Sequence, residues 1–284
     1  MSFRTPRAAV PGLGLGLGLA LVAVLAFSGC AAGGGSAGGG SAADPSASTT
    51  PGPDATPTTL TVFAAASLTE AFDVLAADFE AQHPDLDVAL SYGGSAALAQ
   101  QIVEGAPVDV FASAAEPQMR VVVEAGLAED PVVFATNTLE LVVPAGNPAA
   151  VTELADLADP DLRIALCDPT VPCGAASDAL LAEEGVTASP DTLESDVKAV
   201  LTKVVLGEVD AALVYRTDAR AAGDAVEGIE VPGAASVVNR YPIAAVGAAA
   251  DRGGAQADAA ADFVAFVTGP SGQAALADAG FGAP

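Results

Sequence analysis

Residues 60–72 read LTVFAAASLTEAF, a strand-like segment that runs directly into a helix-like one. The segment opens with a β-branched and aromatic run, and apolar residues then recur near the helical period at Phe72, Leu75 and Phe79. From here to the C-terminus, segments of these two types alternate. This alternation predicts an α/β fold in which helices flank mixed, mostly parallel sheets.

The junction inside this stretch carries a polar signal. Ser67 and Glu70 have the spacing of a capping box, which predicts a helix that begins at Ser67 with the serine hydroxyl as its N-cap. Free N–H groups and a hydroxyl at a helix N-terminus also suit an anion. For a single motif of this kind, a purely structural cap is the favoured interpretation, and similar junctions elsewhere in the chain would change that balance.

The composition excludes two classes of partner. The chain has 284 residues, with 10 Lys and Arg against 36 Asp and Glu, which gives a formal charge of -26. Such a protein does not bind nucleic acid or an anionic membrane through a basic surface. The overall field also repels small anions, so local hydrogen-bond donors would have to hold any anion that binds.

The N-terminus has the features of a lipoprotein signal peptide, predicted over residues 1–29. Arg4 and Arg7 precede an apolar run, and Ser-Gly-Cys closes it, so we expect Cys30 to be the lipid-attachment site. The alternatives are an ordinary secretory signal and an uncleaved anchor. Residues 30–58 consist almost entirely of Ala, Gly, Ser, Pro, Thr and Asp, which predicts a flexible tether. The folded part would then lie on the outer face of the cytoplasmic membrane.

Further junctions between strands and helices repeat the pattern seen at Ser67. Ser95 follows the strand-like residues 87–92 and two glycines, and residues 167–174 (CDPTVPCG) lie between a predicted strand and a predicted helix. Ser195 or Asp196 would cap a helix over residues 196–206. Ligands of open α/β sheets bind outside the carboxyl ends of the strands. These junctions therefore predict a cleft lined by hydroxyl and backbone N–H groups.

Hydrophobic periodicity and Gly or Pro boundaries predict the remaining elements. The expected strands cover 108–112, 139–143, 163–167, 211–215 and 241–246, and the expected helices cover 98–104, 116–124, 152–158, 175–183, 258–267 and 273–279.

Five stretches resemble a known family. TVFAAASLTEAF (61–72), YGGSAALAQQIVEGAPVDVFASA (92–114), LCDPTVPCG (166–174), SDVKAVLTKVVLGEVDAALVYRTDA (195–219) and YPIAAV (241–246) closely resemble the molybdate-binding proteins of bacterial ABC transporters. The resemblance covers residues 60–284 in order. It implies the type II periplasmic-binding-protein fold, with a cleft between lobe 1 (60–139 plus 240–284) and lobe 2 (140–239).

The resemblance also implies a set of molybdate-binding residues. They are the hydroxyl-bearing Ser67, Ser95 and Tyr215, together with the backbone N–H groups of Cys173 and Val197. Cys173 stands where the family often has alanine, and a main-chain contact should survive this difference. A tyrosine such as Tyr215 would otherwise be interpreted as a half-buried core residue.

The implied function is the capture of molybdate or tungstate and its delivery to an ABC transporter permease with its ATPase. We expect a monomer that is not an enzyme, has no cofactor and no site for a free metal cation, and meets the membrane only through its lipid. The first alternative is a protein of the same fold that binds only tungstate, sulfate or an organic anion. A serine hydrolase using Ser67 is a weaker alternative, because only His83 could serve as its histidine base.

Two further predictions concern the neighbourhood of these residues. Cys167 and Cys173 are six positions apart in a protein predicted to be exported, which favours a disulfide. Lys198 and Arg216 adjoin predicted site residues. For both we favour solvated surface charges, with steering of anions as the alternative.

Overall fold

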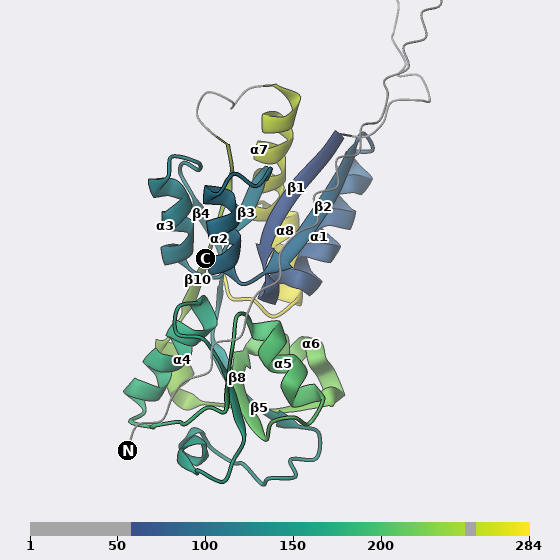
Figure 1. Ribbon diagram of the computed structural model, residues 1–284. Coiled ribbons are helices and arrows are strands. Elements are labelled where there is room, and N and C mark those ends of the chain that lie inside the picture. The colour runs from purple at the N-terminus through teal and green to yellow at the C-terminus, as the bar shows by residue number, and fades with distance from the viewer. Residues whose placement is uncertain (1–57, 248–253) are drawn as a thin grey trace, which may run out of the picture. The chain divides into compact units, whose positions relative to one another are not determined.

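The computed structural model describes residues 58–247 and 254–284 (Figure 1). The predicted signal peptide and the Cys30 lipid site lie outside the described residues, as does the tether except for its last residue. Within the described ranges, no helix is both long enough and apolar enough to cross a bilayer.

Ten strands and eight α-helices make up the described fold, with four short 3-10 helices. The strands are β1 (Thr58–Ala65), β2 (Leu86–Gly93), β3 (Val110–Ala112), β4 (Val132–Asn137), β5 (Leu139–Pro144), β6 (Ile164–Cys167), β7 (Thr192–Glu194), β8 (Ala211–Tyr215), β9 (Val226–Ile229) and β10 (Asn239–Ala245). The α-helices are α1 (Thr69–Gln82), α2 (Ser95–Val103), α3 (Glu116–Glu124), α4 (Pro172–Glu183), α5 (Val197–Val205), α6 (Arg216–Ala222), α7 (Ala255–Thr268) and α8 (Pro270–Asp278). The 3-10 helices are η1 (Ala66–Leu68), η2 (Leu154–Ala158), η3 (Gly223–Ala225) and η4 (Pro232–Ser236).

The strands form two five-stranded sheets, ordered β2-β1-β3-β10-β4 and β7-β6-β8-β5-β9. In the first sheet β1 runs parallel to β2 and β3, and β10 runs antiparallel to its two neighbours. In the second, β6 runs parallel to β7 and β8, and β5 runs antiparallel to its two neighbours. The predicted α/β fold with mixed sheets is confirmed.

The chain passes from the first sheet to the second between β4 and β5, and it returns just before β10. We propose lobe 1 as residues 60–139 plus 240–284 and lobe 2 as residues 140–239, with boundaries close to these two passages.

Hydrophobic residues cover both faces of the first sheet. Successive residues of β1 point to opposite faces. Val62 accordingly belongs to a core with Phe72 of α1 and Phe263 of α7, whereas Phe63 packs on the other side with residues of α2 and α3. Phe79 and Phe263 meet edge to face, with ring centroids 5.1 Å apart. This packing holds the end of β1, and with it Ser67, in one position.

The second sheet has its own core, which joins β5, β6 and β8 to α4 and α5 (green in Figure 1). Val200 and Val204 of α5 and Leu180 of α4 are completely buried in it. Each such side chain contributes roughly 1.5–3 kcal/mol relative to an exposed one. The two helices that begin beside the predicted site are therefore firmly attached to the sheet.

Several elements differ from the sequence-based expectation. β4, β7, β9 and α6 were not predicted, residues 152–158 form only the 3-10 helix η2, and α4 begins at Pro172 instead of residue 175. Proline suits the first turn of a helix because its missing N–H has no acceptor there. The helices predicted over 116–124 and 196–206 end as expected, at Glu124 and Val205. The glycines that mark these two ends, Gly126 and Gly207, both have positive φ (73° and 68°).

Candidate functional site

The five predicted site residues line one small cavity. It has about 20 Å³ of space for the centre of a water-sized sphere. Its walls come from both sheets and consist of Ala65, Ala66, Ser67, Gly93, Gly94, Ser95, Ala114, Val171, Pro172, Cys173, Ser195, Asp196, Val197 and Tyr215. The tertiary structure therefore brings together predicted site residues that are up to 148 positions apart in the chain, from Ser67 to Tyr215.

The topology explains why these residues meet. Ser67 follows the carboxyl end of β1, Ser95 follows that of β2, and Ala114 follows that of β3. In the second sheet, Tyr215 ends β8 and Val197 follows β7. The carboxyl ends of parallel strands lie on one edge of a sheet, and the two such edges face each other across the cavity.

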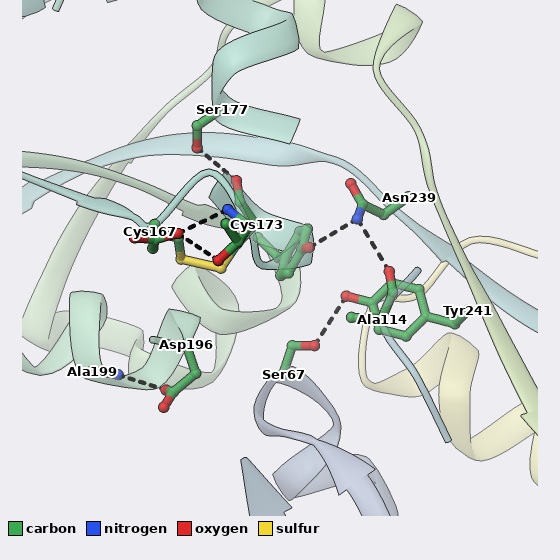
Figure 2. Close-up of a disulfide and its surroundings, with 12 residues drawn as sticks. Ser67, Ala114, Cys167, Cys173, Ser177, Asp196, Ala199, Asn239 and Tyr241 are labelled. Atoms are coloured by element: carbon green, nitrogen blue, oxygen red, sulfur yellow. Dashed lines mark hydrogen bonds between the residues drawn. A yellow bond between two sulfur atoms is a disulfide. The ribbon is translucent and has the colours of Figure 1, made fainter. Parts of the chain in front are cut away.

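Ser67 does not act as the predicted helix cap. It lies inside η1, and the α-helix begins only at Thr69, whose N-cap residue Leu68 has no capping side chain. The Ser67 hydroxyl instead lies 3.0 Å from the hydroxyl of Tyr241 (Figure 2). The capping box is wrong because a long-range partner on β10 takes the hydroxyl and because η1 runs into α1 without an extended residue at the boundary.

Each of the three hydroxyls in the cavity has a fixed partner in the protein. Ser95 Oγ accepts a hydrogen bond from the Ala114 N–H at 3.0 Å. The Tyr215 hydroxyl accepts one from Asn239 Nδ2 at 2.9 Å. When Tyr241 is the donor to Ser67, all three hydroxyls have one lone pair occupied and one proton left to donate. The cavity is therefore suited to a ligand that only accepts hydrogen bonds.

Burial keeps both tyrosine hydroxyls protonated. Desolvation is the main cause that raises the pKa of Tyr215 well above its ordinary value, and it also raises the pKa of Tyr241. Both side chains are almost completely buried. At neutral pH Tyr215 is therefore a neutral donor and adds no negative charge to the cavity.

Two helix N-termini supply the backbone donors. Cys173 lies in the first turn of α4 and Val197 is the first residue of α5, positions where backbone N–H groups have no acceptor within the helix. The Asp196 carboxylate caps α5 by accepting from the Ala199 N–H at 2.9 Å. A positive helix end thus points at the cavity from each of these two elements.

Cys167 and Cys173 form a disulfide in the structure (Figure 2). It joins the end of β6 to the first turn of α4. Ser177 donates to the Cys173 carbonyl oxygen at 2.8 Å, one turn along the same helix. The position of the Cys173 N–H is thus held by a covalent link as well as by the helix.

Lys198, which follows Val197 at the cavity, is paired with two carboxylates. Lys198 is not the predicted solvated charge: its Nζ lies 2.6 Å from Glu70 and 3.0 Å from Asp218, and only 24% of its side chain is exposed. These contacts connect segments that are distant in the sequence, so local pattern could not reveal them. Arg216 is exposed, as predicted. Among residues 58–247 and 254–284, no three His, Cys, Asp or Glu side chains cluster in a way that could hold a metal ion.

Sequence reasoning missed the residues behind the cavity wall. Asn239 and Tyr241 begin β10 and orient two of the three hydroxyls. Asn239 also donates to the Ala114 carbonyl oxygen at 3.1 Å, so it links both sheets. The strand predicted over 241–246 begins at Tyr241, so Asn239 lay outside it, and β10 in fact begins at Asn239. An asparagine and a tyrosine at i and i+2 share one face of a strand, but this pattern is too common to interpret alone.

Comparison with known proteins agrees with this geometry. Residues 60–282 match the model of the family described as bacterial extracellular solute-binding protein. The chain belongs to this family. The molybdate-binding protein ModA of Mycobacterium tuberculosis is 41% identical over 239 residues, which are 84% of this chain and 90% of that protein. The resemblance to the molybdate-binding proteins of bacterial ABC transporters is thereby confirmed.

Solved structures show the same fold. The periplasmic molybdate-binding protein of Azotobacter vinelandii has a TM-score of 0.65 at 23% identity and covers 79% of this chain and 99% of its own. The sulfate-binding protein SubI of Mycobacterium tuberculosis has a TM-score of 0.68 at 21% identity. The match covers 79% of this chain and 86% of SubI. The type II periplasmic-binding-protein fold is thus established. Because one of these two proteins binds sulfate, the fold by itself does not choose the anion.

Proposed function

We propose that this protein captures molybdate, and tungstate as its close analogue, outside the cytoplasmic membrane and delivers it to an ABC transporter permease with its ATPase. The ligand-binding groups would be the hydroxyls of Ser67, Ser95 and Tyr215 and the backbone N–H groups of Cys173 and Val197. No cofactor or catalytic residue takes part.

The observation that carries this proposal is that three hydroxyl-bearing residues and two helix N-termini line one cavity, with the Ser95 and Tyr215 hydroxyls already accepting from donors of the protein. Molybdate is a dianion without protons at neutral pH, so it can accept from all five groups. Hydrogen bonds to a charged partner contribute about 1.5–3 kcal/mol each. Five of them around one ion account for tight binding without a cationic side chain, despite the formal charge of -26.

The volume of the cavity and its hydrogen-bond donors also help to distinguish molybdate from other ligands. Its volume of about 20 Å³ suits one small ion, whereas organic ligands occupy pockets of about 300–1,000 Å³. A protonated phosphate would place its own hydrogen among the five proposed donors, which disfavours it relative to a fully deprotonated anion. Sulfate has the same hydrogen-bonding character as molybdate, so its exclusion would depend on ion size.

A serine hydrolase is disfavoured by the position of the only histidine. His83 directly follows α1 and stacks on Phe79 at a centroid distance of 4.2 Å, at the opposite end of that helix from Ser67. Ser67 has a tyrosine partner instead of a base. The family and the relatives support a solute-binding role.

Attachment to the membrane is proposed through the lipid on Cys30 alone, with residues 31–58 as the tether. One acyl chain holds a protein weakly, and two or more hold it firmly. We propose a monomer, because one chain supplies every group of the cavity.

Calorimetric titration of the purified protein tests the ligand. We expect strong binding of molybdate and tungstate, weak binding of sulfate and no binding of phosphate. Absence of molybdate binding, or a preference for sulfate, would contradict the assignment.

A further inference from the structure

Lys198 lies between two carboxylates that belong to different lobes. It follows Val197 in the first turn of α5, in the second lobe. Its Nζ lies 2.6 Å and 2.8 Å from the two carboxylate oxygens of Glu70 on α1, and 3.0 Å from Oδ1 of Asp218 on α6. Glu70 is three residues after Ser67, so the ion pair joins the segments that carry two of the proposed ligand donors.

The two carboxylates that contact Lys198 differ in burial. Asp218 is completely buried, and its closest cation is Lys198 in the same lobe. Breaking such a pair leaves a buried charge without compensation, which is strongly unfavourable. Lys198 is therefore held by Asp218 whatever the other lobe does. Glu70 is 52% exposed and can return to water when the lobes separate.

We propose that the Glu70–Lys198 ion pair is a positioning contact that holds the two lobes together over the bound anion, with Asp218 keeping Lys198 in place. This inference rests on the proposed function. The pair forms only when α1 and the start of α5 are adjacent, which is also the arrangement that places Ser67 and Val197 on one cavity. Its main effect should be on release of the anion, because opening requires the contact to break.

The same helix offers a matched control. Lys203 of α5 lies 3.5 Å from Glu194 and 3.4 Å from Glu208, and all three residues belong to the second lobe. Glu208 is 55% exposed, close to the value for Glu70. Glu70→Gln and Glu208→Gln therefore remove the same charge from equally exposed positions, and each leaves a lysine with one remaining carboxylate. Only the first removes a contact between lobes.

The first measurement is the rate at which the full-length protein releases radiolabelled molybdate into excess unlabelled molybdate. Glu70→Gln should speed release about two- to fivefold, the range for a partly exposed ion pair. Its association rate should be unchanged or higher, since a negative charge near the cavity is lost. Glu208→Gln should release at the wild-type rate. Equal rates in the two variants, or slower release from Glu70→Gln, would overturn the proposal.

The second measurement needs no ligand. Hydrogen–deuterium exchange of residues 195–200 should be faster in Glu70→Gln than in Glu208→Gln, because the start of α5 is uncovered when the lobes part. Equal exchange in the two variants would also overturn the proposal. If the wild-type protein binds no molybdate, the proposed function fails, and this comparison still decides whether the ion pair holds the lobes together.

Discussion

The hydroxyl oxygens of Ser67 and Tyr241 lie 3.0 Å apart in the buried wall of the cavity. Tyr241 does not line the cavity itself. When Tyr241 is the donor of this hydrogen bond, it occupies a Ser67 lone pair and leaves the serine proton for an anion in the cavity. The two residues are 174 positions apart in the chain.

Tyr241→Phe should therefore weaken molybdate binding without removing any group that contacts the ligand. Loss of one hydrogen bond corresponds to about 1 kcal/mol, or roughly fivefold in affinity. Calorimetric titration measures the change. Tyr92→Phe is the control, because the Tyr92 hydroxyl donates to Asp73 at 2.7 Å and lies outside the cavity. An unchanged affinity in Tyr241→Phe would remove Tyr241 from this role.

Gly94 permits a close approach between the lobes. A Cβ at this position would overlap the backbone carbonyl oxygen of Ser195, although its φ of -63° is accessible to any residue. Gly94→Ala should therefore lower molybdate affinity at least about fivefold, because an overlap of this kind costs about 1–3 kcal/mol. At Gly93, a Cβ would make only ordinary contact with Leu98 at 3.5 Å. Gly93→Ala should bind nearly as well as wild type, and equal losses in both variants would contradict the explanation.

Stability should depend on pH through Asp218. Desolvation raises its pKa from 3.8 to about 6, although Lys198 acts in the opposite direction. Between these values the folded protein binds more protons than the unfolded chain, so this group lowers stability as pH rises from about 4 to 6 and adds no further change above that range. The effect is at most about 3 kcal/mol.

Urea unfolding from pH 4 to 7 tests this dependence by comparing wild type with Asp218→Asn. The stability of wild type relative to the variant should fall across the range of pH 4–6 and then level off. Other carboxyl groups have lowered pKa values, such as Asp210 beside Arg163, and act in the opposite direction in both proteins. A constant difference between the two proteins would contradict the assignment.

The disulfide should stabilise the protein and support binding. Closing a loop with a sequence separation of 6 contributes about 2 kcal/mol in the chain-entropy model. Reduction should lower the free energy of unfolding by this amount and weaken molybdate binding, because the Cys173 N–H is less firmly held. Cys167→Ala/Cys173→Ala should reproduce both effects and should not respond to reductant. Mass spectrometry that found free thiols in the untreated protein would contradict the disulfide.

Local pattern determined much of the fold before any contact was known. Leu60 to Phe79 shows a change from strand to helix period, and it appears as β1, η1 and α1. The stops at Gly126 and Gly207 followed from the positive φ that glycine adopts easily. The three-residue strand β7 and the short helix α6 could not be predicted, since segments of this length have no measurable period.

The sequence by itself determined the α/β fold, the family, and which residues stand at the junctions between strands and helices. These properties depend on neighbours within a few positions or on ordered similarity along the whole chain. The tertiary structure alone decided that Ser67 pairs with Tyr241 and not with its own helix, and that Lys198 joins two lobes instead of facing solvent. Each of these side chains could satisfy its polar groups in more than one way, and the choice depended on which distant residue the packing of the two sheets brought within reach.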